Sequence, residues 1–163
     1  MTVMIAVRET QASCYNGTIV NLLTPKFLTN ENKMNHWSIV AIAVGASIGA
    51  LLRWILGLFM NGWWPTVPLG TLAANLIGGY LIGIAMTFFH HHPGLDPAWK
   101  LLLITGFLGG LTTFSTFSAE NIQLLMNGRL VGASLHGLLH LAASLAATWL
   151  GILTYQYWRN LPS

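Results

Sequence analysis

Apolar residues are concentrated in four long stretches, which are separated by short polar segments. A helix needs about 20 apolar residues to cross the hydrocarbon core of a bilayer, and each stretch reaches that length. The pattern therefore predicts an all-α membrane protein with four transmembrane helices. We expect them at residues 37–60, 68–90, 99–126 and 130–157.

The composition agrees with this prediction and excludes several classes of protein. Of the 163 residues, 54% are hydrophobic and only 7% are charged, whereas soluble domains carry about 25% charged residues. The net charge of +3 comes from seven basic and four acidic residues, too few for a surface that binds nucleic acid. A single cysteine, Cys14, rules out a disulfide within the chain.

Residues 1–33 differ from the rest of the chain. They are polar and mixed, and their apolar runs are too short to span a bilayer. They also lack the basic start and apolar core of a signal peptide. Because Met34 stands directly before the first apolar stretch, we expect a disordered extension or an over-long start assignment, with a functional arm as the alternative. Residues 34–163 then form one four-helix domain.

The third stretch contains an unusual segment, residues 105–120, which reads TGFLGGLTTFSTFSAE. It combines three glycines, six Ser or Thr residues and a Glu with three Phe. Adjacent glycines weaken a helix, and hydroxyl groups can satisfy the backbone groups that a break leaves unpaired. We therefore predict that the third helix is interrupted at Gly109 to Thr112.

Such a break would expose backbone carbonyl groups at membrane depth. The carbonyl oxygens of Gly109 and Thr112 are hard ligands that suit sodium, as at the unwound helices of transporters. The helix that follows, from Thr113 onward, points its positive N-terminal end at the same region. The alternative is a break without an ion, in which Ser and Thr hydroxyls cap the free carbonyls.

Small residues recur at four-residue spacing in all four stretches. Such pairs let helix backbones approach closely, which is a main packing device in lipid. The pattern therefore predicts a tightly packed bundle. The pairs are Gly45 and Gly49, Ala74 and Gly78, Gly79 and Gly83, Gly106 and Gly110, and Ala147 and Gly151.

Basic residues are evenly divided between the two predicted sides of the membrane. From Met34 onward, Lys100 and Arg159 lie on one side, and Arg53 and Arg129 lie on the other. The positive-inside rule then gives no preferred orientation, so a small protein of this kind can insert both ways. We hypothesise an antiparallel, dual-topology homodimer.

Ionisable and amide side chains within the stretches are candidates for function, because they are costly at membrane depth. Arg53 and Glu120 fall toward the same side, so they could pair and anchor the structure, or Arg53 could help form a positive vestibule that attracts anions. Asn75 lies inside the second stretch. Its amide could bond a neighbouring helix or offer N–H donors to an anion.

Phe114 and Phe117 are three residues apart and so share a helix face. They could simply pack against lipid or the core. Alternatively, their positive ring edges could face an anion. Polar neighbours on that face, Thr113, Thr116 and Glu120, favour the second interpretation.

Two histidines, His136 and His140, are one turn apart in the fourth stretch, a spacing that can hold a metal ion. Without a third protein ligand in evident register, we favour a role in lining a polar path or in bonding across helices, and Ser144 continues their face. His90 to His92 are expected in a solvated loop.

Three motifs resemble the CrcB/Fluc family of fluoride channels over residues 34–157. They are GASIGALLRW at 45–54, GTLAAN at 70–75 and GFLGGLTTFSTFSAE at 106–120. The resemblance implies a dual-topology homodimer with two fluoride pathways at the subunit interface. The fourth stretch departs from the family, because many members have Tyr and Ser where His136 and His140 stand.

The resemblance also implies roles for individual residues. Asn75 would be the pore asparagine, and the ring edges of Phe114 and Phe117 would line the fluoride path. Thr116 lies in the matching Ser/Thr-rich segment and would add a hydroxyl group to the pathway. We also place Ser144 on the pathway, because it continues the face of the two histidines. Backbone oxygens of Gly109 and Thr112 from both subunits would hold a central structural sodium ion (Na+).

The expected function is passive export of cytoplasmic fluoride by a channel in the cell (inner) membrane. No nucleotide motif and no catalytic constellation is visible in the sequence, so we do not expect an enzyme. The main alternative is a small dual-topology exporter of organic cations, for which Glu120 would be the coupling carboxylate. A membrane metalloenzyme that uses His136 and His140 is a third possibility.

Overall fold

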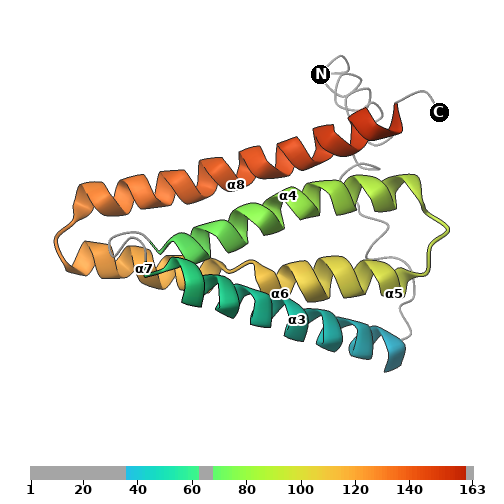
Figure 1. Ribbon diagram of the computed structural model, residues 1–163, viewed down its shortest axis with the longest axis horizontal. Coiled ribbons are helices and arrows are strands. Elements are labelled where there is room, and N and C mark those ends of the chain that lie inside the picture. Colours follow the sequence, from blue (N-terminus) through green and yellow to red (C-terminus); the bar gives the residue numbers. More distant parts are fainter. Residues whose placement is uncertain (1–35, 63–67, 161–163) are drawn as a thin grey trace, which may run out of the picture. The chain divides into compact units, whose positions relative to one another are not determined.

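A computed structural model describes residues 36–62 and 68–160, and these form helices joined by short turns (Figure 1). Four helical segments are long and apolar enough to cross a membrane. They are α3 (His36–Met60), α4 (Leu69–His91), the segment Pro97–Met126, and α8 (Leu130–Arg159). No strand occurs within the described ranges. The predicted all-helical, multi-pass membrane fold is confirmed, and the ends of the spans lie within two residues of those predicted.

Two predictions at the ends of the spans have different outcomes. The extension predicted at residues 1–33 lies outside the described residues. The second span continues farther than predicted, because His90 and His91 belong to α4 and only His92 lies beyond its end. The prediction of a loop at His90 and His91 was therefore wrong. The Arg159 guanidinium of α8 contacts the His91 ring, with Nη1 2.7 Å from Nε2.

The third span is built from consecutive helical pieces. It starts with α5 (Pro97–Lys100), where the Asp96 carboxylate accepts a hydrogen bond of 2.8 Å from the Ala98 N–H and caps the helix. The chain continues as the π-helix η1 (Leu101–Leu108). A π-helix has one extra residue per turn, and such turns are frequent near functional sites.

After η1 the span contains α6 (Gly109–Leu111) and α7 (Phe114–Met126). Gly109 and Gly110 are thus helical, although we expected the break to begin there. The two residues that join α6 to α7 are extended, with ψ of 151° at Thr112 and φ of −149° at Thr113. Two adjacent extended residues turn the path of the chain between α6 and α7.

Glycines allow the helices to touch backbone to backbone. Gly49 of α3 is buried, and a methyl group there would collide with the carbonyl oxygen of Phe107 in η1. Gly83 of α4 packs in the same way on the Thr148 carbonyl of α8. The contact is reciprocal, because Gly151 of α8 packs on the Tyr80 carbonyl of α4. The α3–η1 and α4–α8 pairs are therefore close, as Figure 1 shows.

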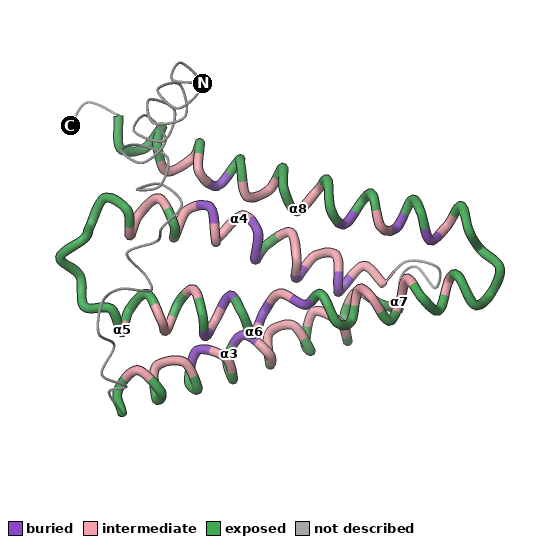
Figure 2. Tube along the Cα trace, turned by 180° about the vertical axis from the view of Figure 1, so that it is seen from behind, coloured by how far each residue is buried: buried purple, intermediate pink, exposed green. Residues whose placement is uncertain are grey.

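The buried residues follow the inner faces of the helices, and the outer faces are apolar and exposed (Figure 2). Ala74, Leu108 and Leu111 form the centre of the hydrophobic core. Large apolar side chains on the outside include Trp54 and Phe114, which are 62% and 79% exposed. Exposed apolar surface of this extent requires lipid or another protein surface to cover it.

Candidate functional site

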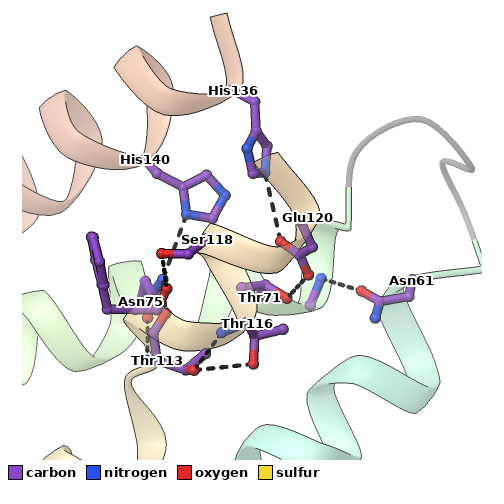
Figure 3. A network of polar contacts seen from close by, with 11 residues as sticks. Asn61, Thr71, Asn75, Thr113, Thr116, Ser118, Glu120, His136 and His140 are labelled. Atoms are coloured by element: carbon purple, nitrogen blue, oxygen red, sulfur yellow. Dashed lines mark hydrogen bonds and ion pairs between the residues drawn. The ribbon is translucent and has the colours of Figure 1, made fainter. Parts of the chain in front are cut away.

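Asn75 of α4 binds the backbone at the junction between α6 and α7. The Thr113 N–H donates a hydrogen bond of 2.8 Å to Asn75 Oδ1, and Asn75 Nδ2 donates one of 3.2 Å to the Thr113 carbonyl (Figure 3). In a continuous α-helix these two backbone groups would have partners on the same helix. The Asn75 side chain replaces those partners, which allows the backbone at Thr113 to extend without leaving buried groups unpaired.

Hydroxyl groups satisfy the helix ends on either side of this junction. Thr112 donates from Oγ1 to the Leu108 carbonyl (2.8 Å) at the end of the first piece. Thr113 caps α7, because its Oγ1 accepts from the Thr116 N–H at 3.2 Å. The same hydroxyl donates to Thr116 Oγ1 at 3.0 Å. A threonine cap of this kind stabilises a helix by about 1 kcal/mol.

Most of the residues predicted to form an ion path line one cleft of about 430 Å³. The Asn75 amide, the Ser144 side chain, and the two rings at positions 114 and 117 come from three different helices. The rings of Phe114 and Phe117 lie 5.5 Å apart, centre to centre, at an angle of 52°. Gly109 and Thr112 line the same cleft. The fold thus brings together residues that are up to 69 positions apart in sequence (75 to 144).

Thr116 lies in a different place. It lines a second cleft of about 430 Å³ together with Arg53, Asn61 and Thr71. Arg53 makes no ion pair with Glu120 in the part of the chain that the structure describes. The expected pairing of Arg53 with Glu120 is therefore not seen within the chain, and the two charged groups lie in different surroundings. Arg53 is the one cationic side chain among the described residues that line the second cleft.

Glu120, which is half-buried, instead belongs to a cluster of polar side chains between α4, α7 and α8. Its neighbours in the cluster, Thr71, His136 and His140, are buried. Thr71 of α4 donates from Oγ1 to Glu120 Oε1 at 2.5 Å. The other carboxylate oxygen, Oε2, lies 3.6 Å from Nε2 of His136. His136 and His140 are 3% and 4% exposed, and their ring centres are 4.4 Å apart. Figure 3 shows both rings pointing from α8 toward Glu120 and Asn75.

The histidine cluster contacts the lining of the first cleft through an aromatic ring. The Phe117 ring stacks on both imidazoles, with centre-to-centre distances of 5.3 Å to His136 and 4.8 Å to His140. In addition, Nδ1 of His140 lies 3.5 Å from Nδ2 of Asn75. Two groups that line the first cleft, the Asn75 amide and the Phe117 ring, therefore both contact the histidines.

Sequence reasoning missed Glu120 as the neighbour of the two histidines, although a signal was present. The turn at 127–129 joins α7 to α8, which then run antiparallel. Positions 120 and 136 are each eight residues from Gly128 (128 − 120 and 136 − 128), so a helical hairpin places them side by side. Counting outward from the turn would have identified the third group.

Comparison with known proteins places these features in one family. Residues 40–152 match the family model described as CrcB-like protein, Camphor Resistance (CrcB). The chain belongs to the CrcB family. The match covers all of α4, α5, η1, α6 and α7 and most of α3 and α8.

Three family members with high identity carry the same description, "Fluoride-specific ion channel FluC". The protein of Tolumonas auensis is 59% identical over 118 residues, which are 72% of this chain and 93% of the relative. That of Chromobacterium violaceum is 56% identical over 123 residues, 76% of this chain and 98% of the relative. The protein of Pseudomonas syringae pv. maculicola is 55% identical over 119 residues, 73% and 94% respectively.

Proposed function

We propose that this chain is a fluoride-specific ion channel that exports cytoplasmic fluoride passively across the cell (inner) membrane. The description of its relatives supports a channel rather than an enzyme. The observation that carries the proposal is the shared cleft, in which the Asn75 amide, two Phe rings and Ser144 converge. These groups suit a small anion, since they supply N–H and O–H donors and positive ring edges.

The path binds fluoride through weak and distributed contacts. One Asn75 N–H donates to the Thr113 carbonyl, while the other faces Nδ1 of His140 at 3.5 Å, a long and therefore weak contact that an anion can displace. No Lys or Arg is among the described residues that line this cleft. A path without a cationic side chain allows release as well as entry, which conduction requires.

Arg53 acts at the entrance to the path. It lines the second cleft beside Thr71 and Thr116, and the Thr113 side of that cleft adjoins the ion path. A cation in a cleft raises the local concentration of anions. Glu120 has a structural role in this arrangement, because its carboxylate contacts Thr71 and His136 of two neighbouring helices.

The functional unit is an antiparallel, dual-topology homodimer with fluoride paths at the interface. The balance of basic residues supports insertion in both orientations. Phe114 lines the cleft and is 79% exposed in the single chain, so a second surface is needed to enclose the path there. A second copy of the chain would supply that surface by symmetry.

The junction at Thr112 and Thr113 interrupts the third helix and suits a structural sodium ion. The N–H that would reach the Gly109 carbonyl in a continuous helix is that of Thr113, and it donates to Asn75 instead. Likewise, the Thr116 N–H that would reach the Thr112 carbonyl donates to Thr113 Oγ1. The carbonyls of Gly109 and Thr112 therefore fit sodium as hard oxygen ligands, and sodium shared between two subunits would hold the two interruptions together.

Fluoride efflux from liposomes tests the proposal. We expect purified protein to release internal fluoride when a potassium ionophore removes the opposing potential, and to release no chloride. Phe114→Ile and Phe117→Ile should each reduce efflux to the level of empty liposomes, because Ile fills the space but has no positive ring edge.

Phe59→Ile provides a matched control. Phe59 is 72% exposed on α3 and lies outside the lining of the cleft, so this variant should conduct like the parent. Absence of fluoride efflux from the parent protein would overturn the function. Full efflux from both cleft variants would overturn the path assigned to Phe114 and Phe117.

A further inference from the structure

Three side chains of α7 and α8 converge in a way that fluoride conduction by itself does not explain. Glu120, His136 and His140 each offer one ligand atom, and these atoms all lie within 4.8 Å of one another. Glu120 Oε2 and His136 Nε2 are 3.6 Å apart. His136 and His140 are one helical turn apart on α8, and Glu120 faces them across the hairpin.

Several of the polar atoms in this cluster have no hydrogen-bond partner within the described part of the chain. They are Glu120 Oε2, both ring nitrogens of His136, and Nε2 of His140. Both histidines are more than nine-tenths buried. A buried polar atom without a partner costs about 1–3 kcal/mol. A single bound ion could satisfy three of these four atoms, one from each residue, because one imidazole binds an ion through one nitrogen.

We propose that Glu120, His136 and His140 form an inhibitory binding site for a transition-metal dication of the Zn²⁺ class. Two imidazoles and one carboxylate are a ligand set that zinc uses when it keeps one coordination position open. The same set disfavours Mg²⁺ and Ca²⁺, which prefer oxygen ligands only. The unpartnered atoms of the cluster are of the kinds that would bind the ion.

The distances suit a tetrahedral ion after a small adjustment. Ligand atoms about 2.0–2.1 Å from a tetrahedral zinc ion are about 3.3 Å from one another. The Glu120–His136 pair, at 3.6 Å, is close to this value already. The widest separation, at most 4.8 Å, needs a movement of roughly 1.5 Å, which side-chain rotation supplies without a shift of the backbone.

Thr71 orients the carboxylate for this role. Its hydroxyl donates to Oε1 of Glu120 and leaves Oε2 directed at His136. Groups that bond a ligand from behind hold it in position and typically change metal affinity about 10- to 100-fold. Thr71 is buried and belongs to α4, so three helices contribute to the site.

A metal ion bound at this site would slow fluoride conduction, and this consequence rests on the proposed function. The dication and Glu120 together leave a net charge of +1 beside Phe117, whose ring contacts both histidines. A fixed cation at the path, with an open coordination position, holds an anion too strongly for rapid release. The bound metal ion would therefore inhibit conduction.

A second contact leads to the same result. Nδ1 of His140 faces the donor Nδ2 of Asn75 at 3.5 Å, so the metal-free ring accepts there and carries its proton on Nε2. Metal on Nε2 moves that proton to Nδ1, which places two donors opposite each other. The resulting repulsion disturbs Asn75, and with it the amide that lines the path.

Metal binding is tested without any measurement of transport. Untagged protein in detergent is titrated with Co²⁺, whose visible absorption reports four-coordinate binding, and Zn²⁺ is then added to displace it. We expect one Co²⁺ per chain. Glu120→Gln, His136→Gln and His140→Gln should each weaken binding at least about 10-fold, since a direct ligand contributes no less than an outer-shell partner.

A triple variant, with His90, His91 and His92 all changed to Gln, is the matched control. It removes the other group of neighbouring histidines, which lies at the end of α4, and should leave the absorption unchanged. Circular dichroism and size-exclusion chromatography confirm that each variant is folded. No tetrahedral Co²⁺ spectrum in the parent protein, or a spectrum lost only in the triple variant, would overturn the site.

The inhibitory role is tested in the efflux assay. Zn²⁺ should slow fluoride release by the parent and the triple variant, whereas Mg²⁺ should not. Any efflux that remains in His136→Gln and His140→Gln should be insensitive to Zn²⁺. Zinc that binds without slowing efflux would overturn the inhibitory role. If the protein carries no fluoride at all, the proposed function fails, and the cobalt spectrum still decides the metal site.

Discussion

Both ends of the Asn75 amide bind the backbone of Thr113, which makes this residue structural as well as a candidate for anion contact. From the sequence these two roles were alternatives. The structure shows the first role, and the second stays a proposal that the geometry allows, because only one of the two amide N–H groups donates to the Thr113 carbonyl.

Removal of the Asn75 amide should destabilise the protein. Asn75→Ala leaves the buried Thr113 N–H and C=O without their partners, and each unpaired group costs about 1–3 kcal/mol. We expect a lower thermal unfolding midpoint in detergent, measured by circular dichroism.

Asn121→Ala is the control for this change. Asn121 belongs to α7, and its side-chain oxygen has no hydrogen-bond partner among the described residues. Its unfolding midpoint should remain near that of the parent. Equal destabilisation by the two substitutions would show that Asn75 does not support the junction.

At the scale of the helices, close packing depends on single glycines. α4 and α8 are in contact because Gly83 and Gly151 each leave room for a carbonyl of the other helix. The small-residue spacing in the sequence predicted such contacts within the bundle. It did not identify which helices pair, because every span carries a similar pattern.

Gly151→Ala should destabilise the α4–α8 pair. The added methyl group would overlap the Tyr80 carbonyl, and overpacking of this kind typically costs about 1–3 kcal/mol. We expect a lower unfolding midpoint than that of Gly132→Ala in the same helix. At Gly132 the nearest atom is the Arg129 Cβ at 3.6 Å, so Ala there should stabilise the helix by about 0.5–1 kcal/mol. The reverse order would contradict the packing described here.

At the scale of the whole molecule, the central question is orientation in the membrane. The third span runs from one end of the bundle to the other. The loop at 92–96, which precedes it, and the turn at 127–129, which follows it, therefore lie at opposite ends. A protein with one orientation exposes only one of these to the outside. An antiparallel dimer exposes both, each on half of the copies.

Single cysteines in a Cys14→Ser background distinguish the two arrangements. Gly94→Cys and Asn127→Cys place a thiol in the loop and in the turn, respectively. With a thiol reagent that does not cross the membrane, we expect about half of the copies to be labelled from outside at each position. Full labelling at one position and none at the other would contradict dual topology.

The sequence by itself determined the four spans, because the length of an apolar run and the thickness of a bilayer leave little choice. It also singled out residues that the fold brings to one cleft, since amides, hydroxyls and Phe rings are conspicuous within apolar stretches. Only the tertiary structure decided where the third span leaves the helical conformation. Gly109 and Gly110 merely permit an irregularity, whereas the Asn75 side chain on another helix binds the Thr113 backbone and makes it stable there. The position of Glu120 was decided in the same way, because its neighbours His136 and His140 reach it only when the hairpin between α7 and α8 has closed.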